Sequence, residues 1–113
     1  MGRKRFISPE FFTHSDLYEA ERSTGLPLRL AYAGLWTAAD RRGLFWWKPR
    51  ELKLAILPYD DVDYDAILWA LEAHGFIECY VVAGKRIGRI PAMERWQSFH
   101  RNEKASDAPE PSN

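Results

Sequence analysis

The stretch that decides the fold runs from Val62 to Ile90 and has the sequence VDYDAILWALEAHGFIECYVVAGKRIGRI. In its first half, apolar residues recur at the three- and four-residue spacing of one helix face: Tyr64, Ile67, Leu68 and Leu71. This spacing predicts a helix from about residue 62 to 74, ended by Gly75. Two β-rich runs follow at 76–82 and 86–90, and the three-residue link between them contains a glycine, which is typical of a β-hairpin.

Two more helices are predicted upstream of this stretch. Between residues 27 and 39, apolar residues again recur at helical spacing: Leu28, Tyr32, Leu35, Trp36 and Ala39. Residues 44–47 form a short β-like run, and a second helix is predicted from 50 to 57, where Pro58 must end it. The order helix, strand, helix, helix, strand, turn, strand indicates an α+β fold. More specifically it predicts a winged helix-turn-helix, with a three-helix core and a C-terminal β-hairpin as the wing.

The chain of 113 residues is long enough for one domain. We expect residues 15–101 to form this domain. Residues 1–14 are predicted to be a basic and aromatic N-terminal arm, with Phe11 or Phe12 docked on the core. Residues 102–113 are rich in proline and small polar residues, which predicts a disordered tail.

Composition indicates where the protein works. A single cysteine, Cys79, allows no internal disulfide and no cysteine-based zinc framework. No apolar run reaches the ~18 residues that a membrane span needs. Residues 1–5 are basic, but the apolar stretch of a signal peptide does not follow them. The sequence therefore predicts a cytoplasmic protein without membrane association.

The neutral overall charge, from 16 basic and 16 acidic residues, conceals a strong segregation. Basic residues concentrate at 1–5, 41–53 and 85–104, whereas residues 54–75 are acidic and contain no lysine or arginine. Local potential, rather than net charge, governs the binding of polyanions. These patches indicate a charged ligand, although each of them alone is also compatible with a merely solvated surface.

Several short motifs, taken in order, are similar to those of a known family. They are Ser8-Pro9-Glu10-Phe11-Phe12, Gly34-Leu35-Trp36-Thr37 with Ala39-Asp40, Leu57-Pro58-Tyr59-Asp60-Asp61, and Gly75-Phe76-Ile77 with the hairpin up to Ile90-Pro91. Over roughly residues 3–101 the chain resembles the N-terminal winged-helix domain of bacteriophage and prophage replication proteins, the replisome organisers and DnaD-like initiators. The resemblance implies a double-stranded DNA-binding domain that acts in replication or transcription control in the host cytoplasm. In that family a C-terminal part often recruits a helicase or another replication protein, and only a short tail follows Lys104 here.

The third helix is a poor candidate for contacting DNA, because its carboxylates would repel phosphates. Asp60 and Asp61 at its start are more typical of helix capping. We therefore expect the backbone of duplex DNA to be gripped by the arm, the wing and the basic surface of the second helix. The predicted DNA-binding residues are Arg3, Lys4, Arg5, Arg41, Arg42, Lys48, Arg50, Lys53, Lys85, Arg86 and Arg89. Such phosphate contacts depend strongly on salt and weakly on base sequence.

A second function stays open, that of a winged-helix protein-interaction module. In this alternative the acidic third helix docks on a host or phage protein and inhibits it. The interacting residues would be Asp65, Trp69 and Glu72, because an exposed tryptophan between acids suits a protein interface.

The tryptophans of the predicted strand bear on both functions. Trp46 and Trp47 are adjacent on a strand and must point to opposite faces, which predicts that one of them is exposed. Trp36 lies on the apolar stripe of the first helix and is expected in the core. Alternatively, Phe6, Phe11 or residues 96–99 fold back over the exposed tryptophans.

No motif predicts catalysis or metal binding. The three histidines have no metal-binding spacing, and the chain has no phosphate-binding loop. Cys79 alternates with Ile77 and Val81, which is typical of a packing residue. The aspartates at 60–65 are not accompanied by the glycine and distal glutamate of a calcium loop. We expect a non-enzymatic protein without cofactor, whose partner is double-stranded DNA; a replication or host protein and a homodimer stay open.

Overall fold

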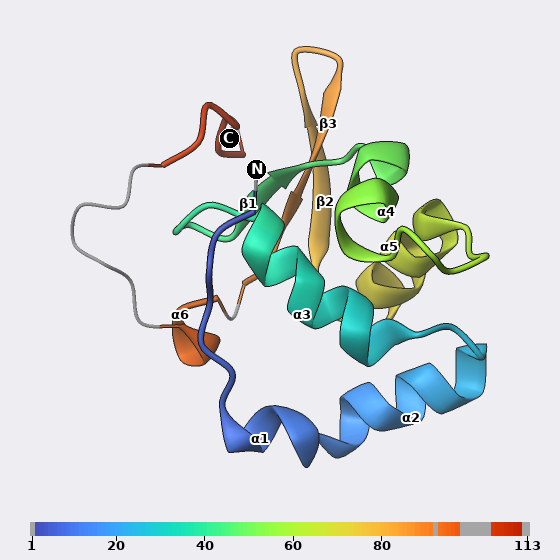
Figure 1. Cartoon of the computed structure of the whole chain (residues 1–113). Helices are drawn as coiled ribbons and strands as arrows, with labels where there is room; N and C mark the ends of the chain where they lie inside the picture. The colour runs from blue at the N-terminus through green and yellow to red at the C-terminus, as the bar shows by residue number, and fades with distance from the viewer. Residues whose placement is uncertain (1, 92, 98–104, 112–113) are drawn as a thin grey trace.

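The computed structural model describes residues 2–91, 93–97 and 105–111 (Figure 1). The elements follow one another as α1 (Pro9–Phe12), α2 (Ser15–Thr24), α3 (Leu28–Ala38), β1 (Leu44–Trp46), α4 (Pro49–Ile56), α5 (Tyr64–Ala73), β2 (Glu78–Val82), β3 (Lys85–Arg89) and α6 (Met93–Trp96). The fold is therefore α+β, with helices and a small antiparallel sheet, and it is compatible with a winged helix. Among the described residues, none of the helices has the length and hydrophobicity that crossing a membrane requires.

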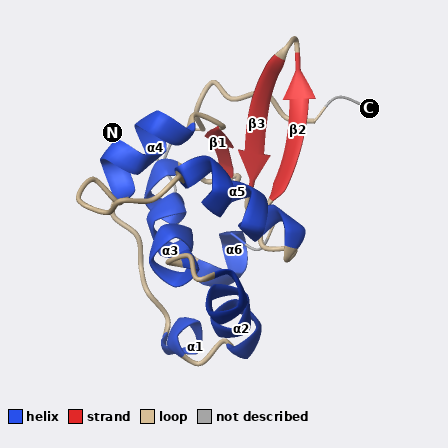
Figure 2. Ribbon diagram, turned by 90° about the vertical axis from the view of Figure 1, so that its right-hand side faces the viewer, coloured by secondary structure: helices blue, strands red, loops and turns tan. Residues whose placement is uncertain are grey.

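The three strands form one antiparallel sheet in the order β1-β3-β2. In this register Leu44 lies opposite Arg89 and Trp46 opposite Ile87, while Val82 and Lys85 close the β2–β3 hairpin. The hairpin projects beyond the helices, with its turn at the tip (Figure 2). Lys85 and the residue after it are thereby carried to the outer end of the sheet.

The hairpin turn has two residues, Ala83 and Gly84, rather than the three expected from the sequence. Both have positive φ, 53° for Ala83 and 76° for Gly84. This geometry matches the right-handed twist of the flanking strands, and glycine adopts it without steric cost. The result is a tight turn that fixes the direction of the two strands.

The core is built around α3, which α2 and α5 pack against. Trp36 is buried, as expected, and stacks on Trp96 with ring centroids 5.3 Å apart, while the Phe11 ring meets Trp36 edge-on at 5.2 Å. Phe11 thus docks the arm on the core, whereas Phe12 stays exposed. Pro9 and Ser8 begin a short helix within the arm, where Ser8 is the N-cap.

The C-terminal segment differs from the disordered tail that its composition predicts. Residues 105–111 lie against the sheet beside β1 (Figure 1), and Ala108 is only 2% exposed because it packs with Leu44 and Ile87. Composition does not reveal this placement, because it depends on a complementary surface that only the folded sheet offers. Residues 98–104, including Arg101 and Lys104 of the third basic patch, lie outside the described residues.

Candidate nucleic-acid interface

A basic hollow lies at the outer end of the sheet, where the hairpin turn approaches the start of α4. It has a volume of about 390 Å³ and is lined by Trp46, Trp47, Lys48, Lys85, Arg86 and Asp107. The antiparallel register explains the gathering, since Trp46 lies opposite Ile87 and the Trp47 N–H donates to the Arg86 carbonyl at 3.1 Å. Residues about forty positions apart in sequence thereby share one surface.

Aromatic rings and cations alternate around the basic hollow. The Lys48 and Lys85 ammonium groups lie 5.9 and 5.7 Å from the centroid of the Trp46 ring. The Arg86 guanidinium lies 5.3 Å from the ring centroid of Trp69. Such cation–π contacts hold the charges close to a flat apolar surface without neutralising them. Positive charge beside aromatic rings is typical of surfaces that bind single-stranded nucleic acids, and the positive charge itself also attracts a duplex backbone.

The cations of the basic hollow are exposed and only weakly paired with carboxylates. Lys85 and Arg86 are exposed, and within the described part of the chain neither forms an ion pair. Lys48 has a carboxylate 3.7 Å away on Glu51, but both side chains are more than half exposed, so the pair is weak. Arg50 is exposed in the first turn of α4, two residues after Lys48.

Other cations of the predicted set gather at the opposite end of the sheet, where carboxylates engage them. Arg41, Arg42 and Arg89 line a smaller hollow of about 220 Å³ together with Glu94 and Glu110. Arg42 pairs with Asp40 at 2.7 Å, and Arg89 pairs with Glu78, its cross-strand neighbour, at 3.1 Å. These residues therefore do not join the basic hollow, and the charges of Arg42 and Arg89 are partly compensated.

The arginines of the arm bind the end of α3. The Arg5 Nε donates to the Trp36 carbonyl at 2.9 Å, and the Arg3 and Arg5 guanidinium groups both donate to the Ala39 carbonyl, at 3.1 and 3.0 Å. The last carbonyls of a helix lack partners within the helix and favour positive charge. Arg3 and Arg5 therefore have a structural role, whereas Lys4 between them is exposed.

Lys53 likewise serves the fold. Its ammonium group donates to the carbonyl of Leu57 at 3.3 Å and so caps the end of its own helix, α4. Of the eleven predicted DNA-binding residues, the structure therefore brings Lys48, Lys85 and Arg86 together around one hollow.

The predicted protein-interaction residues lie on α5 next to the basic hollow. Trp69 is 39% exposed, packs on Trp47 with ring centroids 4.8 Å apart and carries Arg86 on its face. Asp65 accepts a hydrogen bond from the Trp47 indole at 3.4 Å, and Glu72 is exposed. Trp69 is thus continuous with the basic surface, and the protein interface on this helix stays a prediction.

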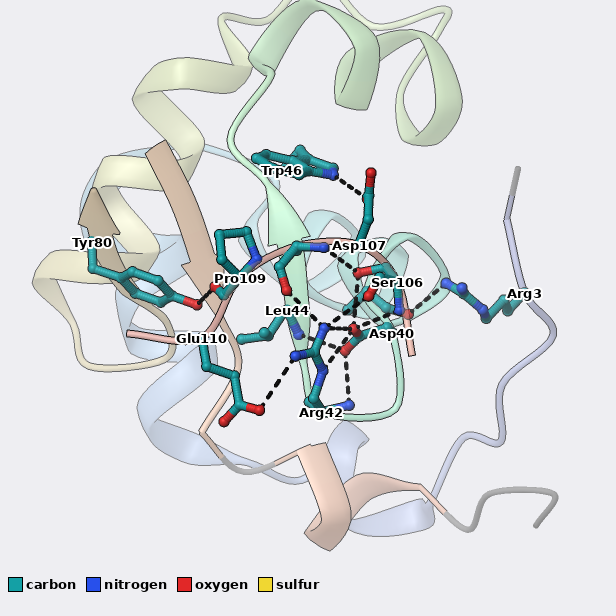
Figure 3. A network of polar contacts seen from close by, with 12 residues as sticks. Arg3, Asp40, Arg42, Leu44, Trp46, Tyr80, Ser106, Asp107, Pro109 and Glu110 are labelled. Carbon is teal, nitrogen blue, oxygen red and sulfur yellow. Dashed lines mark hydrogen bonds and ion pairs between the residues drawn. The ribbon is translucent and has the colours of Figure 1, made fainter. Parts of the chain in front are cut away.

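A buried carboxylate, Asp40, links the end of α3 to β1 and to the C-terminal segment (Figure 3). Asp40 is fully buried, and Arg42 donates to its Oδ2 through Nε at 3.0 Å and Nη2 at 2.7 Å. The backbone N–H groups of Arg42 and Leu44 donate to Oδ1, and Ser106 donates to Oδ2 through both its N–H and its hydroxyl. Sequence analysis missed Asp40 as a key residue, because its partner Ser106 is 66 positions away.

The same network shifts the ionisation of Asp40. Burial alone raises the pKa of a carboxyl group, but the hydrogen bonds from Arg42, Leu44 and Ser106 outweigh it, so the pKa of Asp40 lies below its ordinary value. A carboxyl whose folded-state pKa is lowered stabilises the fold above its unfolded-state pKa of about 3.9, and this stabilisation is lost as the pH falls through the folded value. The network therefore holds at neutral and mildly acidic pH.

We expect Asp40→Asn to destabilise the protein strongly at pH 7 and pH 5, and less as the pH falls below about 4. The reason is that acid protonates the wild-type carboxyl and so removes the charge that the variant already lacks. Urea unfolding of both proteins at pH 7, 5 and 3 measures the difference. A difference in the free energy of unfolding that is the same at pH 3 and pH 7 would contradict this account of Asp40.

The structure bears on both metal binding and thiol chemistry. No group of three or more His, Cys, Asp or Glu among them can hold a metal ion. Burial raises the pKa of the Cys79 thiol, which disfavours the reactive thiolate. No family model, curated protein or solved structure matches the chain.

Proposed function

We propose that this protein is a nucleic-acid-binding winged-helix protein that contacts the sugar-phosphate backbone of duplex DNA. The β2–β3 hairpin is its wing. The observation that carries the proposal is the basic hollow, where Lys48, Lys85 and Arg86 converge beside Trp46. Cations from two separate parts of the chain are held at one projecting end of the fold, where a phosphate backbone can reach them.

The mode of contact follows from which cations are available. In the winged-helix arrangement the wing touches the backbone or the minor groove, while the third helix enters the major groove. Here the α5 surface carries Asp65 and Glu72, and we infer that it does not enter a groove. The wing and the β1–α4 junction, at Lys48 and Arg50, make the contacts instead. The arm is not part of this surface, because Arg3 and Arg5 bind the end of α3.

The resemblance to phage replication proteins supplies the proposed setting, replication or transcription control. Backbone contacts by three or four cations give little discrimination between base sequences. A protein of this kind depends on local DNA concentration or on a further partner for its specificity. Either is compatible with a domain of a replication assembly.

Fluorescence anisotropy with two unrelated 20-base-pair duplexes tests the proposal. We expect both duplexes to bind with similar Kd values in the range of about 1–100 µM near physiological salt. With three or four phosphate contacts, the affinity should fall roughly 40- to 150-fold between 50 and 200 mM salt. Absence of binding at 50 mM salt with 100 µM protein would overturn the proposal, because this concentration is on the order of the weakest non-specific Kd. A strong preference for one duplex would overturn the claim that the protein contacts only the DNA backbone.

A further inference from the structure

The C-terminal segment, residues 105–111, reaches the basic hollow and places a carboxylate in it. The Trp46 indole Nε1–H donates to Asp107 Oδ1 at 3.1 Å, and Asp107 lines the hollow together with Lys48, Lys85 and Arg86. Figure 3 shows Asp107 beside Trp46, with the rest of the segment continuing along β1. The carboxylate is thus an anion at a site where positive charges converge.

The segment is held by specific contacts along its length. Arg42 Nη2 donates to the carbonyls of Ser106 and Ala108, at 3.1 and 2.8 Å, and the Tyr80 hydroxyl donates to the Pro109 carbonyl at 2.7 Å. Ala108 is buried against Leu44 of β1 and Ile87 of β3, which are neighbouring strands of the sheet. Paired backbone carbonyls together with the buried methyl group of Ala108 are typical of a specifically bound peptide.

The C-terminal segment and a nucleic acid would both bring negatively charged oxygen atoms to the basic hollow. The segment places the Asp107 carboxylate on the Trp46 indole, and a nucleic acid would place its phosphates beside the cations of the same hollow. A phosphate placed near Lys85 would lie close to the Asp107 carboxylate, and like charges at such distances repel. A docked C-terminal segment therefore disfavours the binding of nucleic acid in the basic hollow, and bound nucleic acid disfavours docking of the segment.

We propose that the C-terminal segment is a built-in competitor that occupies the nucleic-acid surface and must be displaced when nucleic acid binds. This inference rests on the proposed function. When the competent state is only a fraction of the population, the observed affinity falls by that fraction. Because the segment belongs to the same chain, it competes at a high effective concentration even if each of its contacts is weak.

Two variants of the full chain release the competitor in different ways. Asp107→Asn removes the charge from the hollow and keeps the size of the side chain. Ala108→Gln puts a neutral side chain, too large for the slot, between Leu44 and Ile87, and so expels the segment without changing the charge. The matched control is Glu110→Gln, which removes the segment's other carboxylate from Arg42 at the opposite end of the sheet.

We expect Asp107→Asn and Ala108→Gln to bind duplex DNA about 3- to 10-fold more tightly than the wild type. This gain corresponds to a docked segment that leaves about 10–30% of the wild-type molecules able to bind DNA. Glu110→Gln should stay within about twofold of the wild type, because exposed ion pairs contribute little. The nitrogen-15 NMR signal of the Trp46 indole should move in the same direction in Ala108→Gln as in the wild type saturated with DNA.

The outcomes separate this inference from the proposed function. Wild-type binding that neither Asp107→Asn nor Ala108→Gln improves would overturn the competitor while leaving the DNA surface in place. Equal gains in Asp107→Asn and Glu110→Gln would also overturn it, because they would reflect net charge alone. If neither the wild type nor any variant binds DNA, the proposed function fails, and the competitor fails with it.

Discussion

Replacing Asp40 with alanine is expected to lower the free energy of unfolding by about 3–5 kcal/mol, a large part of the stability of a domain of this size. The carboxylate is fully buried and accepts hydrogen bonds from Arg42, Leu44 and Ser106. Its removal leaves the Arg42 guanidinium without its main partner and two backbone N–H groups of the α3–β1 turn unpaired. Each such group costs free energy when it is buried away from water.

Chemical denaturation of Asp40→Ala beside Glu110→Ala measures the effect with an internal control. Both variants remove a carboxylate from Arg42, but the Glu110 side chain is 70% exposed and its distance to Arg42, 3.4 Å, is long. We expect less than about 1 kcal/mol of destabilisation for Glu110→Ala. Similar losses of stability in the two variants would show that burial of Asp40 does not give the network its strength.

The structure agrees with the sequence where the signal is local. The helix expected at 62–74 is present as α5 (Tyr64–Ala73), and the hairpin follows it as β2 and β3. The residues that determine these elements, the apolar positions of one helix face and the turn residues, lie only a few positions apart in the sequence. The sequence alone is therefore sufficient to predict the elements. The alternation of Trp46 and Trp47 was also informative, since Trp47 is buried and Trp46 is partly exposed.

The roles of the charged residues depend on distant partners, and the sequence does not reveal them. Arg5 binds the Trp36 carbonyl 31 positions away, and Asp40 binds Ser106 across 66 positions. A positive patch in the sequence therefore overestimates the positive surface, because some of its members satisfy carbonyls and carboxylates in the fold. The run Trp46-Trp47-Lys48 places basic and aromatic residues side by side, and all three line the basic hollow in the structure.

This distinction between engaged and available cations yields the sharpest test of the proposed function. The double variant Lys85→Glu with Arg86→Glu should weaken duplex binding by about 100-fold or more, because each charge-assisted hydrogen bond to a phosphate contributes roughly 1.5–3 kcal/mol. The slope of log affinity against log salt should also become shallower by about 2, since each phosphate that the protein no longer binds reduces it by about 1. Anisotropy titrations at several salt concentrations measure both quantities, and circular dichroism with thermal unfolding checks that the fold is kept.

Net charge alone also weakens DNA binding, so the comparison needs a variant with the same change elsewhere. Arg22 is exposed on α2, away from the sheet, and Arg22→Glu alters the total charge as much as the single variant Arg86→Glu does. If the wing holds the phosphate, Arg86→Glu should lose about tenfold or more in affinity, while Arg22→Glu stays within about twofold, since charges beyond a Debye length of ~8–10 Å are largely screened. Equal losses of affinity in the two single variants would mean that the DNA is attracted by the molecule as a whole and that the basic hollow has no special part in binding it.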